Sequence, residues 1–170
     1  MTTIYRPSNR GRKTETLSIR LDEQTRFMLE FAARIKGQSI SSVVERAIRT
    51  AAESVITEGQ WNGEGGKRWS DYWDDNPGIR AINFARDKAT FPTTKEEDLI
   101  HFITRHIGFF SKTSDIANVC CEHIDVLWPS IERYVKLWQD TRATKPWQAG
   151  YEMALVLKQA GLPIPAWPPT

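Results

Sequence analysis

The stretch T-L-S-I-R-L-D, residues 16–22, alternates polar and apolar side chains without interruption. The apolar set is Leu17, Ile19 and Leu21, and the polar set is Thr16, Ser18 and Arg20. This alternation predicts a β-strand with two different faces. None of the next roughly forty residues repeats the pattern, so a strand here finds no partner nearby in its own chain.

Two amphipathic helices are predicted directly after this strand. Asp22 can cap the first helix, because its carboxylate can accept hydrogen bonds from first-turn N–H groups. Gly37 is suited to end that helix, and Ser39 is the predicted cap of the second, which fades near residues 53–57. Apolar residues recur at helical spacing in both, at Met28, Leu29, Ala32 and Ile35 and then at Ile40, Val44, Ala47, Ile48 and Ala51.

The strand and two helices enclose too little interior to be stable as a single copy. The strand would also leave both of its edges unpaired. Both difficulties disappear if two copies pair their strands antiparallel about a two-fold axis and four helices close over the apolar face. The sequence therefore predicts a homodimer, whose core would contain Leu17, Ile19, Leu21, Leu29, Val44 and Ile48.

Residues of about 14–53 resemble the ribbon-helix-helix superfamily of DNA-binding dimers, the Arc, MetJ and CopG-like regulators. The resemblance lies in the strand pattern T-L-S-I-R-L, the first amphipathic helix and the turn K-G-Q-S-I-S-S that leads into V-V-E-R-A-I. The fold class that it implies is mainly α. A ribbon-helix-helix domain at 14–57, forming an intertwined dimer, would precede an all-helical C-terminal domain.

The resemblance also implies how double-stranded DNA would be bound. A two-stranded ribbon fits the major groove, where Arg20 can make a bidentate contact to guanine. The N-terminus of the second helix would hold a phosphate. The implied base-reading residues are Thr16, Ser18 and Arg20, and the implied phosphate-binding residues are Ser39, Ile40 and Ser41.

Charge along the chain agrees with a polyanionic partner. Residues 1–56 contain ten Lys and Arg against six Asp and Glu, whereas the whole chain has a formal net charge of only +2. Residues 1–13 form a predicted basic, flexible arm, in which Arg10, Arg12 and Lys13 would contact DNA without sequence preference. No stretch is apolar and long enough for a membrane helix or a secretory signal, which predicts a cytoplasmic protein without a membrane partner.

A change in composition separates the N-terminal domain from the rest. All seven tryptophans follow residue 60, after a glycine-rich predicted linker at 58–68. Residues 69–170 are predicted to form a helical domain. Its predicted helices are a short one near 79–87, one that starts at Thr93 or Thr94, a long one at 115–141 interrupted by Pro129, and one at 147–159. The proline-rich tail is expected to be extended.

The C-terminal domain offers no motif for catalysis. Cys120 and Cys121 are adjacent, and neighbouring positions on a helix point about 100° apart, which is poor geometry for a zinc site. Its aromatic residues are interpreted mainly as core, with a ligand pocket or protein interface as the alternative. We therefore expect no metal, no cofactor and no enzymatic activity.

The function predicted from the sequence is sequence-specific DNA binding by a prokaryotic transcriptional regulator, typically a repressor. Higher-order assembly on DNA remains open, as does a protein partner for the C-terminal domain. Two alternatives remain. One is an antitoxin that neutralises a toxin through residues 69–170 and autoregulates its operon, and the other is a plasmid partition or relaxosome accessory protein.

Overall fold

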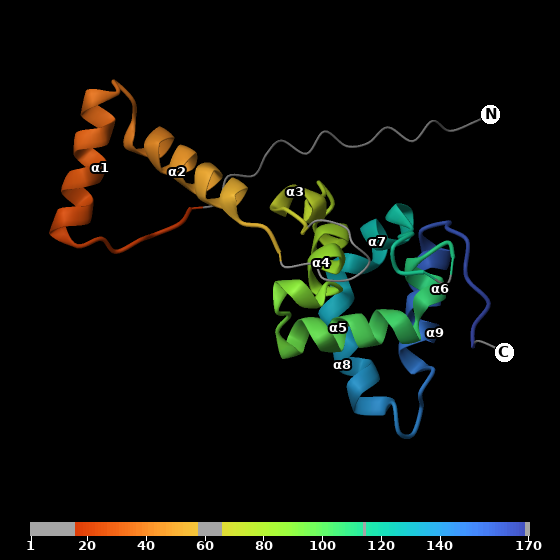
Figure 1. Ribbon diagram of the computed structural model, residues 1–170. Coiled ribbons are helices and arrows are strands. Elements are labelled where there is room, and N and C mark those ends of the chain that lie inside the picture. Colours follow the sequence, from red (N-terminus) through yellow and green to blue (C-terminus); the bar gives the residue numbers. More distant parts are fainter. Residues whose placement is uncertain (1–15, 58–65, 114, 169–170) are drawn as a thin grey trace, which may run out of the picture. The chain divides into compact units, whose positions relative to one another are not determined.

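The computed structural model describes residues 16–57, 66–113 and 115–168 (Figure 1). Contacts divide the chain between Thr50 and Ala51 into two compact units. We call the described residues before this point unit 1 and those after it unit 2. Regular structure in the described residues is helical, apart from an isolated antiparallel bridge between Ser111 and Val119.

Unit 1 contains α1 (Glu23–Ile35) and most of α2 (Ile40–Ser54), and the predicted helix ends are confirmed. Asp22 Oδ1 accepts from the N–H of Thr25 at 2.9 Å. Gly37 has φ 59°, the left-handed conformation that glycine adopts without strain after a helix. Ser39 Oγ accepts from the N–H of Ser42 at 3.1 Å and so caps α2. Local sequence therefore determines both helices.

The predicted strand at residues 16–22 is wrong, and with it the ribbon-helix-helix fold class. These residues precede α1 without forming a strand, and no sheet occurs in the part of the chain that the structure describes. The physical reason is that a strand exists only through ladder hydrogen bonds to a neighbour. No described segment of this chain lies beside residues 16–22 to supply those bonds.

Unit 2 is built from short helices. Those of seven residues or more are α4 (Pro77–Ala85), α5 (Thr94–Arg105), α7 (Cys121–Leu127), α8 (Ile131–Thr141) and α9 (Gln148–Gln159). Two single turns, α3 (Trp69–Tyr72) and α6 (Ile107–Phe110), and two 3₁₀ turns, Lys88–Thr90 and Trp128–Ser130, connect them.

Two of the longer helices of unit 2, α4 and α5, begin at residues whose side chains cap them, Asn76 and Thr93. Thr93 and Glu96 form a capping box at α5, in which each side chain accepts a backbone N–H of the other residue. The predicted interruption of the helix at 115–141 is confirmed, because a 3₁₀ turn separates α7 from α8, but its predicted start is wrong, because α7 begins only at Cys121. Pro129 lies in that turn, where its missing N–H interrupts α-helical hydrogen bonding.

The core of unit 2 forms where helices α4 to α9 pack together. Its fully buried side chains include Ile82, Phe102, Phe109, Ile124, Leu127, Tyr134, Met153 and Leu157. Exposed side chains outside this core also join distant parts of the chain by hydrogen bonds. Asn76 Nδ2 donates to Asp125 Oδ1 at 2.7 Å, and Gln139 Nε2 donates to Asp98 Oδ2 at 3.0 Å.

The aromatic residues of unit 2 are only partly core, as Tyr134 and Trp138 are buried whereas Trp69 and Trp73 are exposed. Most of the predicted linker, residues 58–65, lies outside the described residues. Residues on either side of 58–65 are hydrogen-bonded to each other, since the N–H of Thr57 donates to the carbonyl of Lys67 at 2.9 Å. In the described parts of the chain, no helix is both long and apolar enough to span a membrane.

Candidate nucleic-acid interface

The predicted base-reading segment is exposed on every side. Leu17, Ile19 and Leu21 are 72%, 58% and 44% exposed, and all the polar residues that alternate with them are exposed as well. In a single chain, residues 16–22 therefore do not form one face that is buried and another that is free to contact DNA. Arg20 is exposed, so its guanidinium is accessible to a ligand.

The helices of unit 1 likewise leave their apolar stripes in solvent. Phe27, Met28, Phe31 and Ile35 are all more than half exposed, and the rings of Phe27 and Phe31 stack on one another with centroids 6.5 Å apart. Ala33 is the only described residue of α1 or α2 that is buried. Of the predicted dimer core, Leu29 and Val44 are half-buried and Ile48 is exposed.

The predicted phosphate site at the start of α2 has the geometry of a capped helix N-terminus. Ser39 caps the helix, and the N–H groups of Ile40 and Ser41 have no acceptor among the described residues. The first turn of α2 carries no acidic side chain. Arg34 and Lys36 are exposed and close the preceding helix, so positive charge flanks the cap in sequence. Sequence reasoning did not select these two residues, although a basic pair directly before a turn and a serine cap is a usable signal.

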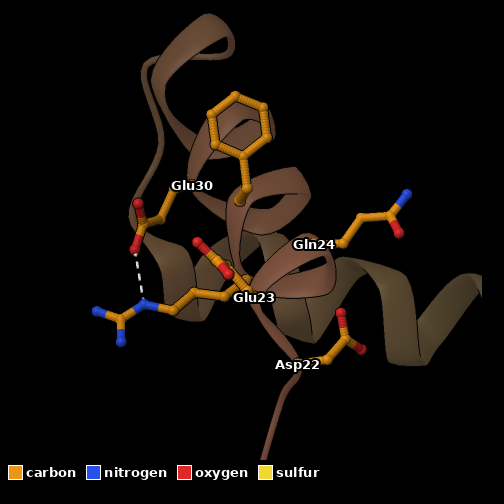
Figure 2. A pocket seen from close by; sticks show the side chains of 6 residues that line it. Asp22, Glu23, Gln24 and Glu30 are labelled. Atoms are coloured by element: carbon orange, nitrogen blue, oxygen red, sulfur yellow. Dashed lines mark hydrogen bonds and ion pairs between the residues drawn. The ribbon is translucent and has the colours of Figure 1, made fainter.

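The start of α1 carries charge of the opposite sign. An open hollow there is lined by residues of one helix and its cap: Asp22, Glu23, Gln24, Arg26, Phe27 and Glu30. Figure 2 shows the carboxylates along this helix, with Glu30 Oε1 paired to Arg26 Nε at 3.0 Å. Hydrogen bonds from Thr25 lower the pKa of Asp22, which keeps its carboxylate charged. This hollow is therefore unsuited to a phosphate backbone.

Unit 2 has a cleft that sequence reasoning did not locate. Arg80 and Glu96 line it together with four aromatic rings from α3 and α4. These rings belong to Trp69, Tyr72, Trp73 and Phe84. The Arg80 guanidinium lies 4.4 Å from the centre of the Trp73 ring and donates to the carbonyl of Asp74. Trp69 and Trp73 follow one another at helical spacing, but that pattern does not reveal that both remain exposed.

Asp87 anchors the base of α3 to the turn after α4. It accepts from Lys67 Nζ at 2.9 Å, from the Tyr72 hydroxyl at 2.8 Å and from the N–H of Ala89 at 3.0 Å. The hydrogen bond from Lys67 lowers the pKa of Asp87 to about 2. The carboxylate therefore serves as a charged structural anchor next to the aromatic cleft.

The histidines and cysteines of unit 2 are dispersed. His106 is fully buried, with Nδ1 2.9 Å from the carbonyl of Phe102 and burial lowering its pKa to about 4. His123 is also buried, next to the carbonyl of Phe109. Cys120 is buried and Cys121 is exposed. In the ranges that the structure describes, no three His, Cys, Asp or Glu side chains are placed to hold a metal ion.

Comparison of the chain with family models, with curated proteins and with solved structures found no match. The ribbon-helix-helix resemblance therefore stays a prediction, carried by the residues quoted above.

Proposed function

We propose that this chain is a sequence-specific DNA-binding protein that acts as a homodimer, with unit 1 on the duplex. The observation that carries the proposal is the surface of unit 1. It combines unpartnered apolar stripes with a capped, positively flanked helix N-terminus and an exposed arginine. The apolar stripes call for a second copy, and the polar features suit a polyanion.

The case for a second copy rests on the exposed apolar side chains. Leaving Phe27, Phe31 and Ile35 in water forgoes on the order of 1 kcal/mol for each side chain that a partner would cover. A unit of this length does not bury enough surface to be stable by itself. A two-fold dimer would bury the same stripe from both chains.

The case for DNA rests on groups suited to phosphates and to base edges. In a dimer, two copies of the α2 N-terminus would each offer the N–H groups of Ile40 and Ser41 to a phosphate, with Arg34 and Lys36 adding positive charge. Arg20 can discriminate guanine from other bases by about 1–3 kcal/mol. The arm residues Arg10, Arg12 and Lys13, which lie outside the described residues, would add contacts that depend on salt.

Base reading and phosphate binding can be tested with matched variants. DNA fragments selected by the purified protein from a random pool would define its preferred site. We expect Arg20→Ala to reduce the preference for that site over random DNA by about tenfold or more. Ser39→Asp keeps a good helix cap but places a negative charge at the phosphate, so it should weaken binding to all sequences about equally.

Ser39→Asn is the control for Ser39→Asp, because it caps the helix without adding charge. It should bind DNA nearly as the wild type does. The absence of any preferred site in the selected pool would overturn the proposal. If Arg20→Ala preserved the preference, Arg20 would not be the reading residue.

Dimerisation can be tested at the apolar stripe of α1. Phe31→Asp places a charge in the proposed dimer core and should produce monomers and at least about a hundredfold loss of DNA affinity, measured by analytical ultracentrifugation and binding titration. Phe91→Asp in unit 2, at a ring that is 89% exposed, is the control and should leave both properties unchanged. A wild type that stays monomeric at all concentrations and on DNA would contradict the homodimer.

Regulation of transcription is the role that we propose for this DNA binding. Mapping of bound sites across the genome distinguishes it from a plasmid accessory role, because the latter places the protein at an origin or partition site and not at promoters. The exposed aromatic cleft of unit 2 favours one further candidate, an antitoxin that binds a toxin through this domain. Co-expression with the product of an adjacent gene, followed by co-purification, would test it.

A further inference from the structure

The segment that follows α9 is held to unit 2 by side chains and scarcely by its backbone. We call residues 162–168 the strap. Leu162, Pro165 and Trp167 are half-buried, and the residues between them are exposed. The N–H of Leu162 donates to the carbonyl of Leu157 at 3.0 Å, and no later backbone hydrogen bond of the strap occurs within the described residues. Segments held in this way open at low free energy.

Trp167 occupies a slot that fits an indole. Its Nε1 donates to the carbonyl of Trp147 at 3.2 Å. Its ring stacks on His106, with centroids 5.0 Å apart and an interplanar angle of 25°. The rings of Phe109 and Trp147 meet it edge-on at 5.1 and 5.2 Å. The slot therefore provides a stacking face, two walls and one hydrogen-bond acceptor.

Two glycines make room for the strap. A Cβ atom on Gly150, in the first turn of α9, would lie 2.1 Å from Cε2 of Trp167. A Cβ atom on Gly108, in α6, would lie 3.2 Å from Cβ of Pro165. Glycine weakens a helix relative to alanine, so its presence at Gly150 is explained by the indole that lies against it.

The strap is an imperfect occupant of this slot. It helps to cover His106, which is fully buried and whose Nε2 has no hydrogen-bond partner in the described part of the chain. A buried polar atom without a partner opposes the closed state, because opening would return water to it. Aromatic packing of Trp167 therefore favours the bound position of the strap, whereas the unpartnered Nε2 of His106 opposes it.

We propose that the groove between α6 and α9 is a peptide-binding site, which the strap occupies in cis and can vacate. Its ligand is an extended apolar segment with a tryptophan next to proline, as in the strap's own Pro-Ala-Trp-Pro. A free groove accepts the same segment in trans. The short α6 and the first turn of α9 form a preorganised receptor, and the strap acts as its intramolecular competitor.

The test uses the full chain with Trp167→Ala, which empties the slot. The probe is an acetylated, fluorescein-labelled peptide with the sequence of residues 162–168, followed by fluorescence anisotropy. We expect saturable binding to Trp167→Ala, and roughly hundredfold weaker binding to the wild type, because a tethered competitor acts at an effective concentration in the millimolar range. A peptide with alanine in place of tryptophan should bind at least about tenfold more weakly than the probe.

Gly150→Ala combined with Trp167→Ala provides the matched control. The added methyl group would overlap the position of a bound indole, while alanine favours the helix, so the double variant should remain folded by circular dichroism and fail to bind the probe. Free indole should raise the melting temperature of Trp167→Ala and leave that of the double variant unchanged. Equal probe binding by the two variants, or none by Trp167→Ala while it remains folded, would overturn the proposal.

Discussion

Units 1 and 2 are stabilised by contacts of different range. In unit 1, side-chain hydrogen bonds join residues three or four positions apart, as in Asp22–Thr25, Arg26–Glu30 and Ser39–Ser42. In unit 2, Asn76 is hydrogen-bonded to Asp125 and Gln139 to Asp98, which joins residues 49 and 41 positions apart. The first set can form in any helix of that sequence, whereas the second requires the fold.

Burial differs in the same direction. Unit 1 leaves most of its large apolar side chains in water, and unit 2 encloses an aromatic and aliphatic core. Unit 1 is held by local contacts and leaves its apolar surface uncovered. These are the features of an incomplete folding unit. The comparison teaches that a well-capped pair of helices is not by itself a domain.

The largest expected effect lies in the core of unit 2. Phe102 is fully buried and meets Phe110 and Trp138 edge-on at 6.0 Å each. Phe102→Ala removes these contacts and leaves a cavity, so we expect a loss of about 3–5 kcal/mol in the free energy of unfolding, measured by urea denaturation of unit 2. The loss should not depend on protein concentration.

Phe91→Ala is the control for this variant, because its ring is 89% exposed in a left-handed residue with φ 54°. It should change the stability by less than about 0.5 kcal/mol in either direction. Similar losses for both variants would contradict the tight packing of Phe102 in the core of unit 2.

A smaller effect is expected from acid, again in unit 2. The pKa of buried His106 is about 4, against 6.5 for an accessible histidine, so between these values the unfolded chain binds more protons. Stability is therefore fully present above pH 6.5 and falls as the pH falls toward 4, by up to about 3 kcal/mol. His106→Phe should flatten this slope in denaturation series, whereas His101→Gln, at an exposed position, should preserve it.

The smallest effects compare one ion pair from each unit. Asp87→Ala removes the carboxylate shared by Lys67 and Tyr72 and should destabilise unit 2 by about 2 kcal/mol. Arg26→Ala breaks an exposed pair within α1 and should change stability by less than about 0.5 kcal/mol. Urea denaturation at pH 7 measures both, and a larger loss for Arg26→Ala would contradict the contrast between the units.

The contribution of Asp87 should also disappear in strong acid. Its pKa is about 2 in the folded chain against a usual value of 3.8, so its stabilisation is present above pH 3.8 and lost as the pH falls through 2. Asp87→Ala should therefore converge with the wild type in stability at the acid end of the series.

Helix ends were the features that sequence predicted best. Asp22, Gly37 and Ser39 act as predicted, and Thr93 is the one of the two predicted caps that is used, because capping depends on a side chain and a backbone group only a few residues away. The sequence also predicts the break at Pro129, although it places the start of the preceding helix six residues before Cys121, where α7 begins. Local chemistry determines where a helix can begin, and packing decides which starts are used.

The sequence predicts only part of the candidate interface. Ser39, Ile40 and Ser41 follow from the cap, but Arg34 and Lys36 were not selected because charge alone does not distinguish a ligand site from a solvated face. The alternation at 16–22 predicted a strand that a single chain does not form. Strand formation depends on a partner, which a sequence pattern cannot supply.

By itself, the sequence determined the paired helices of unit 1, their caps, the basic bias of the N-terminal part and the helical character of unit 2. These follow from spacing, composition and interactions between near neighbours. Only the tertiary structure decided that Trp69 and Trp73 stay exposed while Trp167 fills a slot over Gly150, and that His106 is buried. Such outcomes depend on contacts between residues far apart in the chain, where the same side chain is stable in a core or on a surface according to what lies opposite.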